Sequence, residues 1–224
     1  MSVIESALNI VAPHDCLICG HEGSLICSWC LHSVRTILPG RCYCCKKVDS
    51  ESSVCKNCRH KSYLRHVWIA SEYGGVAKEL VYDLKFNRVK AAARPIGVLM
   101  AELLPYFPEE VIVVHIPTAT SRRRQRGYDH AELIARNVAK ERGLRHATLL
   151  ARLGQARQVG SRRQIRHEHM ARAFRIQKPY LVRGAHILLV DDIVTTGATL
   201  EAATRVLKEA GARTIDAVAF AQKV

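Results

Sequence analysis

The sequence has few of the features that would place a protein in a membrane or outside the cell. No run of about 18 apolar residues occurs, so a membrane-spanning helix is not expected. The N-terminus lacks a basic segment and carries Glu5, which argues against a secretory signal. Its apolar residues recur at helical spacing and predict a short amphipathic helix that docks on the protein. We therefore expect a cytoplasmic protein without a membrane span.

Aromatic and acidic residues are also scarce. Aromatic residues make up 6% of the 224 residues, so a broad platform for stacking nucleic-acid bases is not indicated. Only 20 acidic residues accompany 34 lysines and arginines, and the formal net charge is +14. This excess favours anionic partners such as nucleic acids, phosphorylated metabolites or an acidic membrane surface. A basic surface that serves only solubility is the alternative.

No cysteine follows Cys58, although nine lie between Cys16 and Cys58. A disulfide framework would suit a small secreted domain, and no export signal is present. Thiolates in C-x-x-C pairs suit tetrahedral zinc, because a tight turn places both sulfurs on one side of the metal. Four such pairs supply the predicted metal ligands, which are Cys16, Cys19, Cys27, Cys30, Cys42, Cys45, Cys55 and Cys58.

Two arrangements of these pairs are compatible with the spacing. Consecutive pairing gives one site from the first two pairs and a second site from the last two. Cross-bracing instead links the first pair with the third and the second with the fourth. Consecutive pairing is favoured, because short loops cost less closure entropy. Either way all ligands come from protein, which predicts two structural Zn²⁺ ions. Cys44 is then spare, and His14, His21 and His32 are bystanders.

The remainder of the chain has the pattern of an α/β domain. Strands are expected over residues 66–73, 111–116, 187–190 and 214–219, and helices over 76–84, 96–104, 131–140 and 197–210. Alternating strands and helices imply a mostly parallel sheet with helices on both faces. We expect an N-terminal helix and zinc module over residues 1–62 and the α/β domain over residues 63–224. A hydrophobic content of 48% suffices for one sizeable core and a small accessory module.

Residues 187–200 form the most specific motif. Four apolar residues are followed by two acids, and a loop of threonine and glycine then opens a helix. Backbone N–H groups at a helix start bind anions, glycine allows close approach of a phosphate, and carboxylates accept from ribose hydroxyls. An ordinary strand, turn and helix with an acidic cap is the alternative. The predicted binding residues are Asp191, Asp192, Thr195, Thr196, Gly197, Ala198 and Thr199.

This stretch resembles the motif with which type I phosphoribosyltransferases bind 5-phosphoribosyl-1-pyrophosphate (PRPP). The resemblance implies the corresponding fold and a PRPP ligand accompanied by Mg²⁺. It also implies that the loop after the strand over 111–116 holds the pyrophosphate, for which backbone donors in a tight turn would serve. A plain strand-to-helix loop is the alternative, since the loop residues are not distinctive. They are Pro117, Thr118, Ala119 and Thr120.

Two clusters of arginine lie near the expected ligand face of the sheet. Arginine binds phosphate through two parallel hydrogen bonds, so either cluster suits PRPP, pyrophosphate or a nucleic-acid backbone. A solvated face without a partner is the alternative. The first cluster is Arg122, Arg123, Arg124 and Arg126, and the second is Arg157, Arg162, Arg163 and Arg166.

Several segments together resemble the ComF/GntX family. They are the cysteine pairs, the motif over 187–200, the tripeptide Leu84-Lys85-Phe86, the stretch 126–135, and the positions of Gln155, Arg166 and Phe174. The family has Asn-Gln where this chain has Asp129-His130, and His169 stands where an Asn is usual. An ionised Asp only accepts hydrogen bonds whereas an amide also donates, so residues 129 and 130 are not carried over as binding residues.

The resemblance implies a role in natural transformation. In that role the protein would bind PRPP and single-stranded DNA and would contact proteins of the DNA-uptake machinery. Transfer to an unidentified acceptor, as an active phosphoribosyltransferase, and PRPP sensing by a regulator are the alternatives. Salvage of 6-oxopurines is disfavoured, because those enzymes resemble one another in having an acidic base where this chain has Thr195, and threonine takes no proton near neutral pH.

Overall fold

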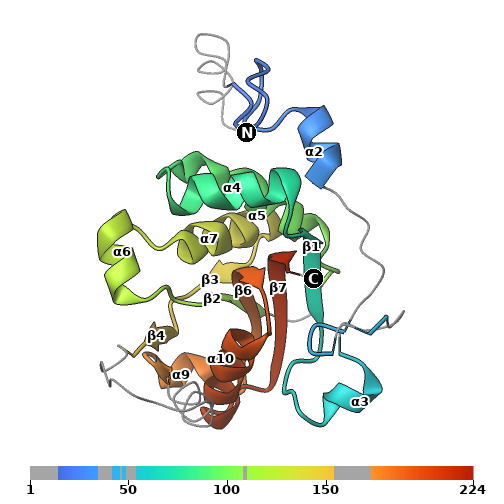
Figure 1. The fold of residues 1–224 in the computed structure, drawn as a ribbon. Coiled ribbons are helices and arrows are strands. Elements are labelled where there is room, and N and C mark those ends of the chain that lie inside the picture. The colour runs from blue at the N-terminus through green and yellow to red at the C-terminus, as the bar shows by residue number, and fades with distance from the viewer. Residues whose placement is uncertain are drawn as a thin grey trace, which may run out of the picture.

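A parallel five-stranded sheet forms the centre of the molecule (Figure 1). The computed structural model describes residues 15–34, 42–45, 47–48, 54–107, 110–153 and 173–223. Every neighbouring pair of strands in this sheet is parallel. In spatial order the strands are β1 (Val67–Glu72), β7 (Thr214–Gln222), β6 (His186–Val194), β2 (Val111–His115) and β3 (Arg145–His146). The predicted α/β class with a mostly parallel sheet is therefore confirmed.

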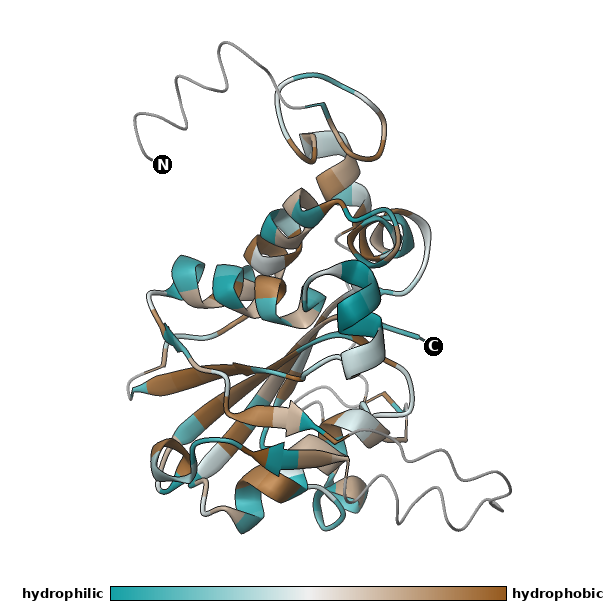
Figure 2. Cartoon of the chain, turned by 90° about the vertical axis from the view of Figure 1, so that its left-hand side faces the viewer, coloured by the Kyte–Doolittle hydropathy of each residue, from teal (hydrophilic) through white to brown (hydrophobic). Residues whose placement is uncertain are grey.

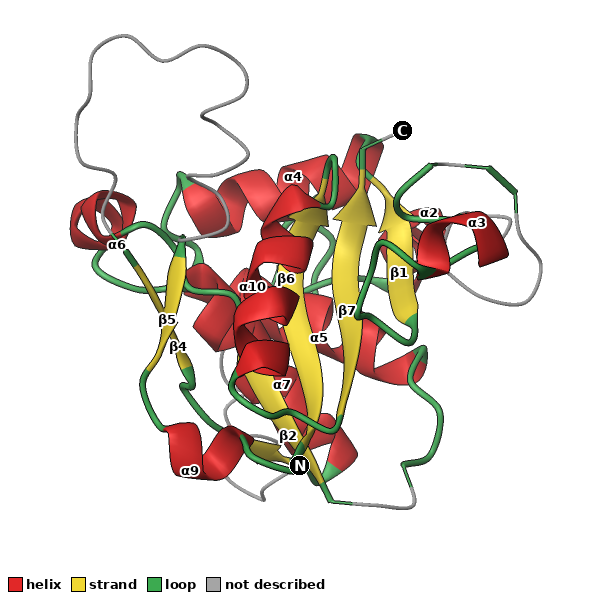
Figure 3. Ribbon diagram, turned by 90° about the horizontal axis from the view of Figure 1, so that it is seen from below, coloured by secondary structure: helices red, strands yellow, loops and turns green. Residues whose placement is uncertain are grey.

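Helices cover both faces of the sheet (Figures 1 and 3). One face carries α4 (Gly75–Lys85), α5 (Ala93–Glu102) and α7 (His130–Arg142), and the other carries α10 (Ala198–Glu209). Because both faces are covered, the central strands read as continuous apolar runs, and all five residues of β2 are buried. Figure 2 shows the same pattern, with hydrophobic residues on the strands and on the helix sides that meet them.

Smaller elements flank this sheet. The single turns are η1 (Lys90–Ala92) and α9 (Pro179–Val182), and α6 (Thr120–Arg126) follows the loop after β2. A separate antiparallel pair joins β4 (Leu150–Arg152) to β5 (Phe174–Ile176). Among the described residues, none of the helices has the length and apolar character that crossing a membrane requires.

The cysteine segment contributes to both hydrophobic cores. The part with α2 (Ser28–Val34) packs against α4, where Val34 is buried in the core beneath α4, α5 and α7. The part with α3 (Lys56–Arg59) instead places Tyr43 and Val54 in the core beneath α10. Figure 1 shows α2 and α3 at well-separated places around the domain. The boundary expected after residue 62 falls between α3 and β1.

One prediction about the strands was wrong. The strand over 187–190 does not end at the two aspartates but continues to Val194. The reason lies in its neighbour, because β7 extends to Gln222 and pairs with residues beyond the acids, Ile193 with Ala221 and Val194 with Gln222. Asp191 and Asp192 are therefore residues of the sheet itself.

Candidate functional site

Asp192 is a buried carboxylate held by two basic side chains. Lys85, the last residue of α4, forms an ion pair with Asp192 Oδ2, and His130 Nε2 lies 3.1 Å from the same oxygen. Burial alone would favour the neutral acid. The hydrogen bond from His130 and the charge of Lys85 outweigh it and hold the pKa of Asp192 well below its usual range. Asp192 is thus a fixed negative charge at the carboxyl edge of the sheet.

Its neighbour Asp191 behaves in the opposite way. Removal from bulk water and the charge of Asp192 raise the pKa of Asp191 well above its usual range. Its carboxylate accepts from the Asp192 backbone N–H at 2.9 Å, and Arg152 on β4 lies near enough for its charge to interact with Asp191. Burial, Lys85 and His130 therefore push the pKa values of the two carboxyls apart.

The contacts of His130 define which of its two ring nitrogens donates and which accepts. Arg126 Nη1 lies 3.0 Å from His130 Nδ1, and a guanidinium only donates, so Nδ1 must be the accepting nitrogen. The ring proton then sits on Nε2, which donates to Asp192. These two contacts form a hydrogen-bonded relay from Arg126 through His130 to Asp192. The relay connects the start of α7 to the acid pair, Asp191 and Asp192.

Asp129 fixes the loop that follows β2. Its carboxylate accepts from the Thr118 backbone N–H and from Thr118 Oγ1, both at 2.9 Å. It also caps α7 by accepting from the Ala131 N–H at 3.1 Å. The predicted pyrophosphate loop, Pro117–Thr120, is thus attached to the same helix start that carries His130. Residues 129 and 130 contact protein groups of the site, a role that the sequence reasoning missed.

The predicted phosphoribosyl loop joins β6 to α10. Thr195 and Thr196 are exposed, Ala198 and Thr199 are partly buried, and Gly197 is the buried N-cap of α10 with a φ of 77°. Thr196 Oγ1 accepts from the Ala198 N–H at 3.4 Å. The structure therefore brings the acid pair, this loop and the start of a 12-residue helix together at one edge of the sheet.

A basic cleft of about 550 Å³ lies beside Asp129. Its wall includes the loop residues Pro117, Thr118 and Thr120, and its guanidinium groups come from Arg123, Arg124, Arg152 and Arg175. The first two belong to the arginine cluster on α6, which the sequence did not predict to be helical. Arg152 and Arg175, on β4 and β5, were missed, because each is an isolated arginine in the sequence.

The other predicted arginines have different positions. Arg122 is exposed on α6, close enough to Arg152 for their charges to interact. Arg126 binds His130 and lies over the Phe86 ring at 5.3 Å, so it belongs to the relay. The second cluster, Arg157, Arg162, Arg163 and Arg166, lies outside the described residues, as do Gln155 and His169.

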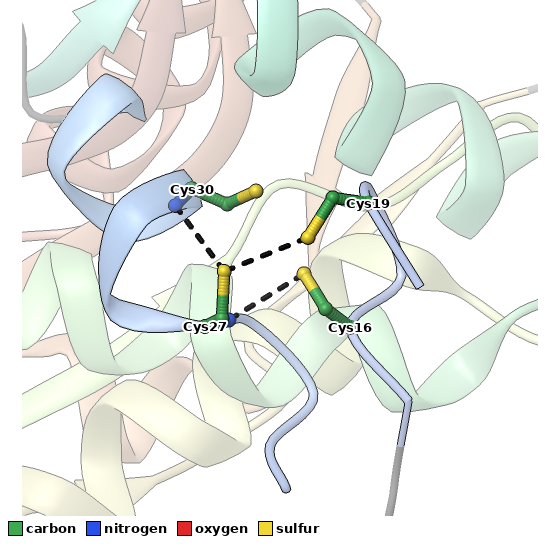
Figure 4. Close-up of side chains that lie close together, drawn as sticks. All are labelled: Cys16, Cys19, Cys27 and Cys30. Carbon is green, nitrogen blue, oxygen red and sulfur yellow. Dashed lines mark hydrogen bonds between the residues drawn. The ribbon is translucent and has the colours of Figure 1, made fainter. Parts of the chain in front are cut away.

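The eight paired cysteines form two groups of four, in the consecutive arrangement. Within each group all Sγ atoms lie within 4.8 Å of one another. Figure 4 shows the first group, Cys16, Cys19, Cys27 and Cys30, with the thiols pointing toward one another. The second group is Cys42, Cys45, Cys55 and Cys58. Among the described residues no histidine belongs to either group, and Cys44 lies outside both.

The geometry of both groups fits zinc. Tetrahedral zinc with Zn–S bonds of about 2.3 Å separates its sulfurs by about 3.8 Å. The separation between Cys19 Sγ and Cys27 Sγ is 3.6 Å, and that between Cys45 Sγ and Cys55 Sγ is also 3.6 Å. Burial opposes ionisation of Cys16 and Cys42, but backbone N–H donors outweigh it and lower the pKa of each thiol to about 6. Both groups thus fit the predicted double zinc ribbon.

Residues 101–224 match the model of the phosphoribosyl transferase domain. The chain belongs to this family. It is 28% identical over 222 residues to the DNA utilization protein YhgH of Salmonella typhi, covering 92% of this chain and 96% of the relative. It is also 27% identical over 198 residues to the competence protein ComFC of Bacillus subtilis, covering 83% and 79%. These similarities confirm the resemblance to the ComF family.

A solved structure of an allosteric regulatory enzyme of purine biosynthesis also matches. The similarity covers 58% of this chain and 26% of that chain, with 19% identity and a TM-score of 0.43. The family assignment therefore rests on the sequence of the phosphoribosyl transferase domain and on the ComF relatives.

Proposed function

We propose that the carboxyl edge of β6 binds PRPP with Mg²⁺, and that the protein acts in the uptake or use of DNA. The observation that carries the proposal is Asp192, an ionised buried carboxylate held by Lys85 and His130 beside the start of α10. A family fold alone would not require such a charge. A buried charge cluster contributes little to stability compared with apolar packing, and clusters that shift the pKa of a carboxyl in this way are typical of functional sites.

Each part of PRPP has a matching group at this edge. The acids Asp191 and Asp192 suit the ribose hydroxyls, and the N–H groups at the start of α10 suit the 5-phosphate. The loop Pro117–Thr120, together with Arg123 and Arg124 in the cleft, suits the pyrophosphate. Mg²⁺ would neutralise charge on the pyrophosphate, and carboxylate oxygens such as those of the acid pair are the ligands it prefers.

Replacement of both acids tests this assignment. Asp191→Asn with Asp192→Asn should abolish calorimetric binding of PRPP in the presence of Mg²⁺ while circular dichroism stays that of the folded protein. Asp83→Asn is the matched control, since Asp83 lies on the same helix as Lys85 and its side chain accepts from Asn87 Nδ2 at 2.8 Å, away from the acid pair. Unchanged PRPP affinity in the double variant would contradict the assigned role.

The DNA proposal is supported by three observations. The relatives are named for DNA utilization and competence, the net charge is +14, and exposed arginines of α6 flank the cleft. Guanidinium groups on one short helix suit a phosphate backbone without reading its sequence. We infer sequence-independent binding of single-stranded DNA, and proteins of the uptake machinery are the expected partners.

A salt series tests the DNA surface. Fluorescence anisotropy with a labelled oligonucleotide should show affinity that falls steeply with salt. Replacing Arg122, Arg123 and Arg124 by Ala should weaken binding and reduce that slope. Arg126 is left intact, because its loss would disturb His130. The control replaces three exposed cations away from the cleft, Lys78, Arg94 and Lys140, with the same loss of charge. Equal losses of DNA affinity and of salt slope in both triple variants would contradict the assignment of the DNA-binding surface to α6.

An active transferase is the second candidate. The cleft of about 550 Å³ extends from the pyrophosphate loop to Arg175 on β5, which leaves room for an acceptor beside PRPP. The assay is release of pyrophosphate from PRPP across a panel of acceptors. Acceptor-dependent release would establish transfer, whereas binding without release would favour a PRPP sensor.

We also propose that each cysteine group holds one structural Zn²⁺. All four ligands of each site come from the protein, so no position is left for a substrate. Metal analysis of a reduced, untagged preparation should give two zinc ions per chain, and a value below about one would contradict the proposal.

A further inference from the structure

Tyr43 of the second cysteine group is buried against the phosphoribosyl loop. It follows the ligand Cys42, and its side chain has an exposed fraction of 0%. A Cβ added to Gly197 would lie 2.9 Å from Tyr43 Cε2 and 3.0 Å from Cδ2. The ring therefore occupies the space that any other residue at 197 would need. Gly197 was predicted from the sequence to allow the close approach of a phosphate, because it has no Cβ. The same lack of a Cβ makes room for the Tyr43 ring.

The Tyr43 hydroxyl reaches the first turn of α10. It donates to Glu201 Oε1, and Ser62 Oγ lies 2.7 Å from the same hydroxyl. Because the Tyr43 proton goes to Glu201, Ser62 is the donor in the second contact. The Glu201 backbone N–H in turn donates to Gly197 O at 3.0 Å, the first bond of the helix. One side chain thus contacts both the N-cap of α10 and its first turn.

The position of Tyr43 itself depends on the cysteine group. Residues 43–45 form a turn, without a helix or strand to hold them. The contacts that fix this turn are the Cys42 N–H to Lys47 O bond at 2.9 Å and the convergence of Cys42 and Cys45 with Cys55 and Cys58. A metal bonded to these four sulfurs would fix the turn, and with it the ring.

Within residues 15–34, the first cysteine group shows no equivalent contact with α10. Its aromatic residue, Trp29, precedes the ligand Cys30 but is 77% exposed. The apolar residues near its cysteines, such as Leu17 and Ile26, pack only partly buried against the core beneath α4 and α5. Among the described residues of the cysteine segment, the fully buried side chain shown in contact with α10 is Tyr43 of the second group.

We propose that Tyr43 is a positioning residue for the phosphoribosyl loop, and that the second zinc site holds it in place. The inference rests on the proposed function, because the loop is assigned to the 5-phosphate. Loss of the ring would release residues 195–199 from their binding conformation. If that conformation were populated a tenth of the time, the affinity for PRPP would fall about tenfold.

The experiment compares Tyr43→Leu, Tyr43→Phe and the control Trp29→Leu. Hydrogen exchange of the peptide over 194–201 reports the loop without ligand, and calorimetry with PRPP and Mg²⁺ reports binding. Tyr43→Leu should speed hydrogen exchange in that peptide. It should also lower the affinity for PRPP about tenfold, if the loop keeps its binding conformation about a tenth of the time. Tyr43→Phe keeps the ring and should have a smaller effect on both readouts. Trp29→Leu should change neither.

The two readouts separate this inference from the function on which it rests. Unchanged exchange in Tyr43→Leu would overturn the positioning role. Faster exchange in a protein whose wild type binds no PRPP would support positioning and overturn the proposed ligand. Should Tyr43→Leu fail to fold, Glu201→Ala removes the contact between the Tyr43 hydroxyl and α10 and leaves the ring and the Ser62 contact in place. That variant should still speed exchange over 194–201, and unchanged exchange there would again contradict the proposal.

Discussion

The two cysteine groups share their chemistry but differ in what they support. Each has four cysteines in two C-x-x-C pairs, and each has a pair of sulfurs 3.6 Å apart. The first packs Val34 and several partly exposed apolar side chains on the face of the sheet covered by α4, whereas the second buries Tyr43 and Val54 beneath α10. The ligand pattern therefore predicts a metal site in each group, and the residues between the ligands decide which part of the domain would depend on that metal.

Removing the metal from one cysteine group at a time should give the largest difference between the two groups, measured as the affinity for PRPP. Cys42→Ser with Cys45→Ser should remove one zinc ion and lower PRPP affinity by about tenfold or more, because Tyr43 loses its anchor. Cys16→Ser with Cys19→Ser should also remove one zinc ion but leave PRPP affinity unchanged. Metal analysis and calorimetry on the same samples provide the measurement. Equal losses of affinity in both variants would remove the distinction between the groups.

Two glycines with similar backbone angles sharpen the comparison. Gly20 in the first group has a φ of 72° and nothing within 4 Å of an added Cβ, whereas Gly197 has a φ of 77° and the Tyr43 ring at 2.9 Å. Each change to Ala costs about 1 kcal/mol for the left-handed conformation. Gly197→Ala should cost about 1–3 kcal/mol more for overpacking. Denaturant unfolding measures both, and addition of Tyr43→Leu should relieve the extra cost at 197 only.

The smallest expected effect is a pH dependence at Glu201, the residue of α10 that accepts from the Tyr43 hydroxyl. Burial raises the pKa of Glu201 to about 7, with the nearby Arg205 opposing the shift. An acid whose pKa is raised by folding binds its proton more tightly in the folded state than in the unfolded state. Its contribution to stability is therefore complete below the unfolded pKa of about 4.5 and is lost as pH rises through about 7. Solvent screening at this partly exposed site limits the contribution to about 1 kcal/mol.

Glu201→Gln tests this dependence, since it removes the titrating group and keeps the side-chain shape. The free energy of unfolding, measured by urea titration between pH 4.5 and 8, should decline less in the variant than in the wild type. A decline of the same size in both proteins would show that other groups titrate in that range.

The sequence predicted the parts of the molecule that depend on local patterns. Strands β2 and β6 were identified because both of their faces are buried, which leaves runs such as Ile187–Val190 wholly apolar. The cysteine groups were identified because two residues between sulfurs suit a metal. The loop 195–199 was placed at a helix start because its residues are typical of one.

Contacts between distant segments could not be predicted in this way. His130 reaches Asp192 across 62 positions, and Tyr43 reaches Glu201 across 158. Neither residue belongs to a local sequence pattern that predicts its partner. Residues 129 and 130 were not predicted to belong to the site, because Asp129-His130 departs from the Asn-Gln of the ComF/GntX family. The limits of β6 depended likewise on the length of β7, which lies in another part of the chain.

Placement of the acid pair within β6 has a thermodynamic consequence. Asp192 meets Lys85 and His130, and the charges of Lys85 and Arg152 both act on Asp191. Pairing of β6 with β7 on both sides of the acids holds their backbone rigid before any ligand arrives. If this edge binds PRPP as proposed, the ordering of backbone on binding should fall mainly on the loop 195–199, and not on the acids. Calorimetry of ligand fragments should then show a larger unfavourable entropy for fragments that carry the 5-phosphate than for fragments that carry the ribose alone.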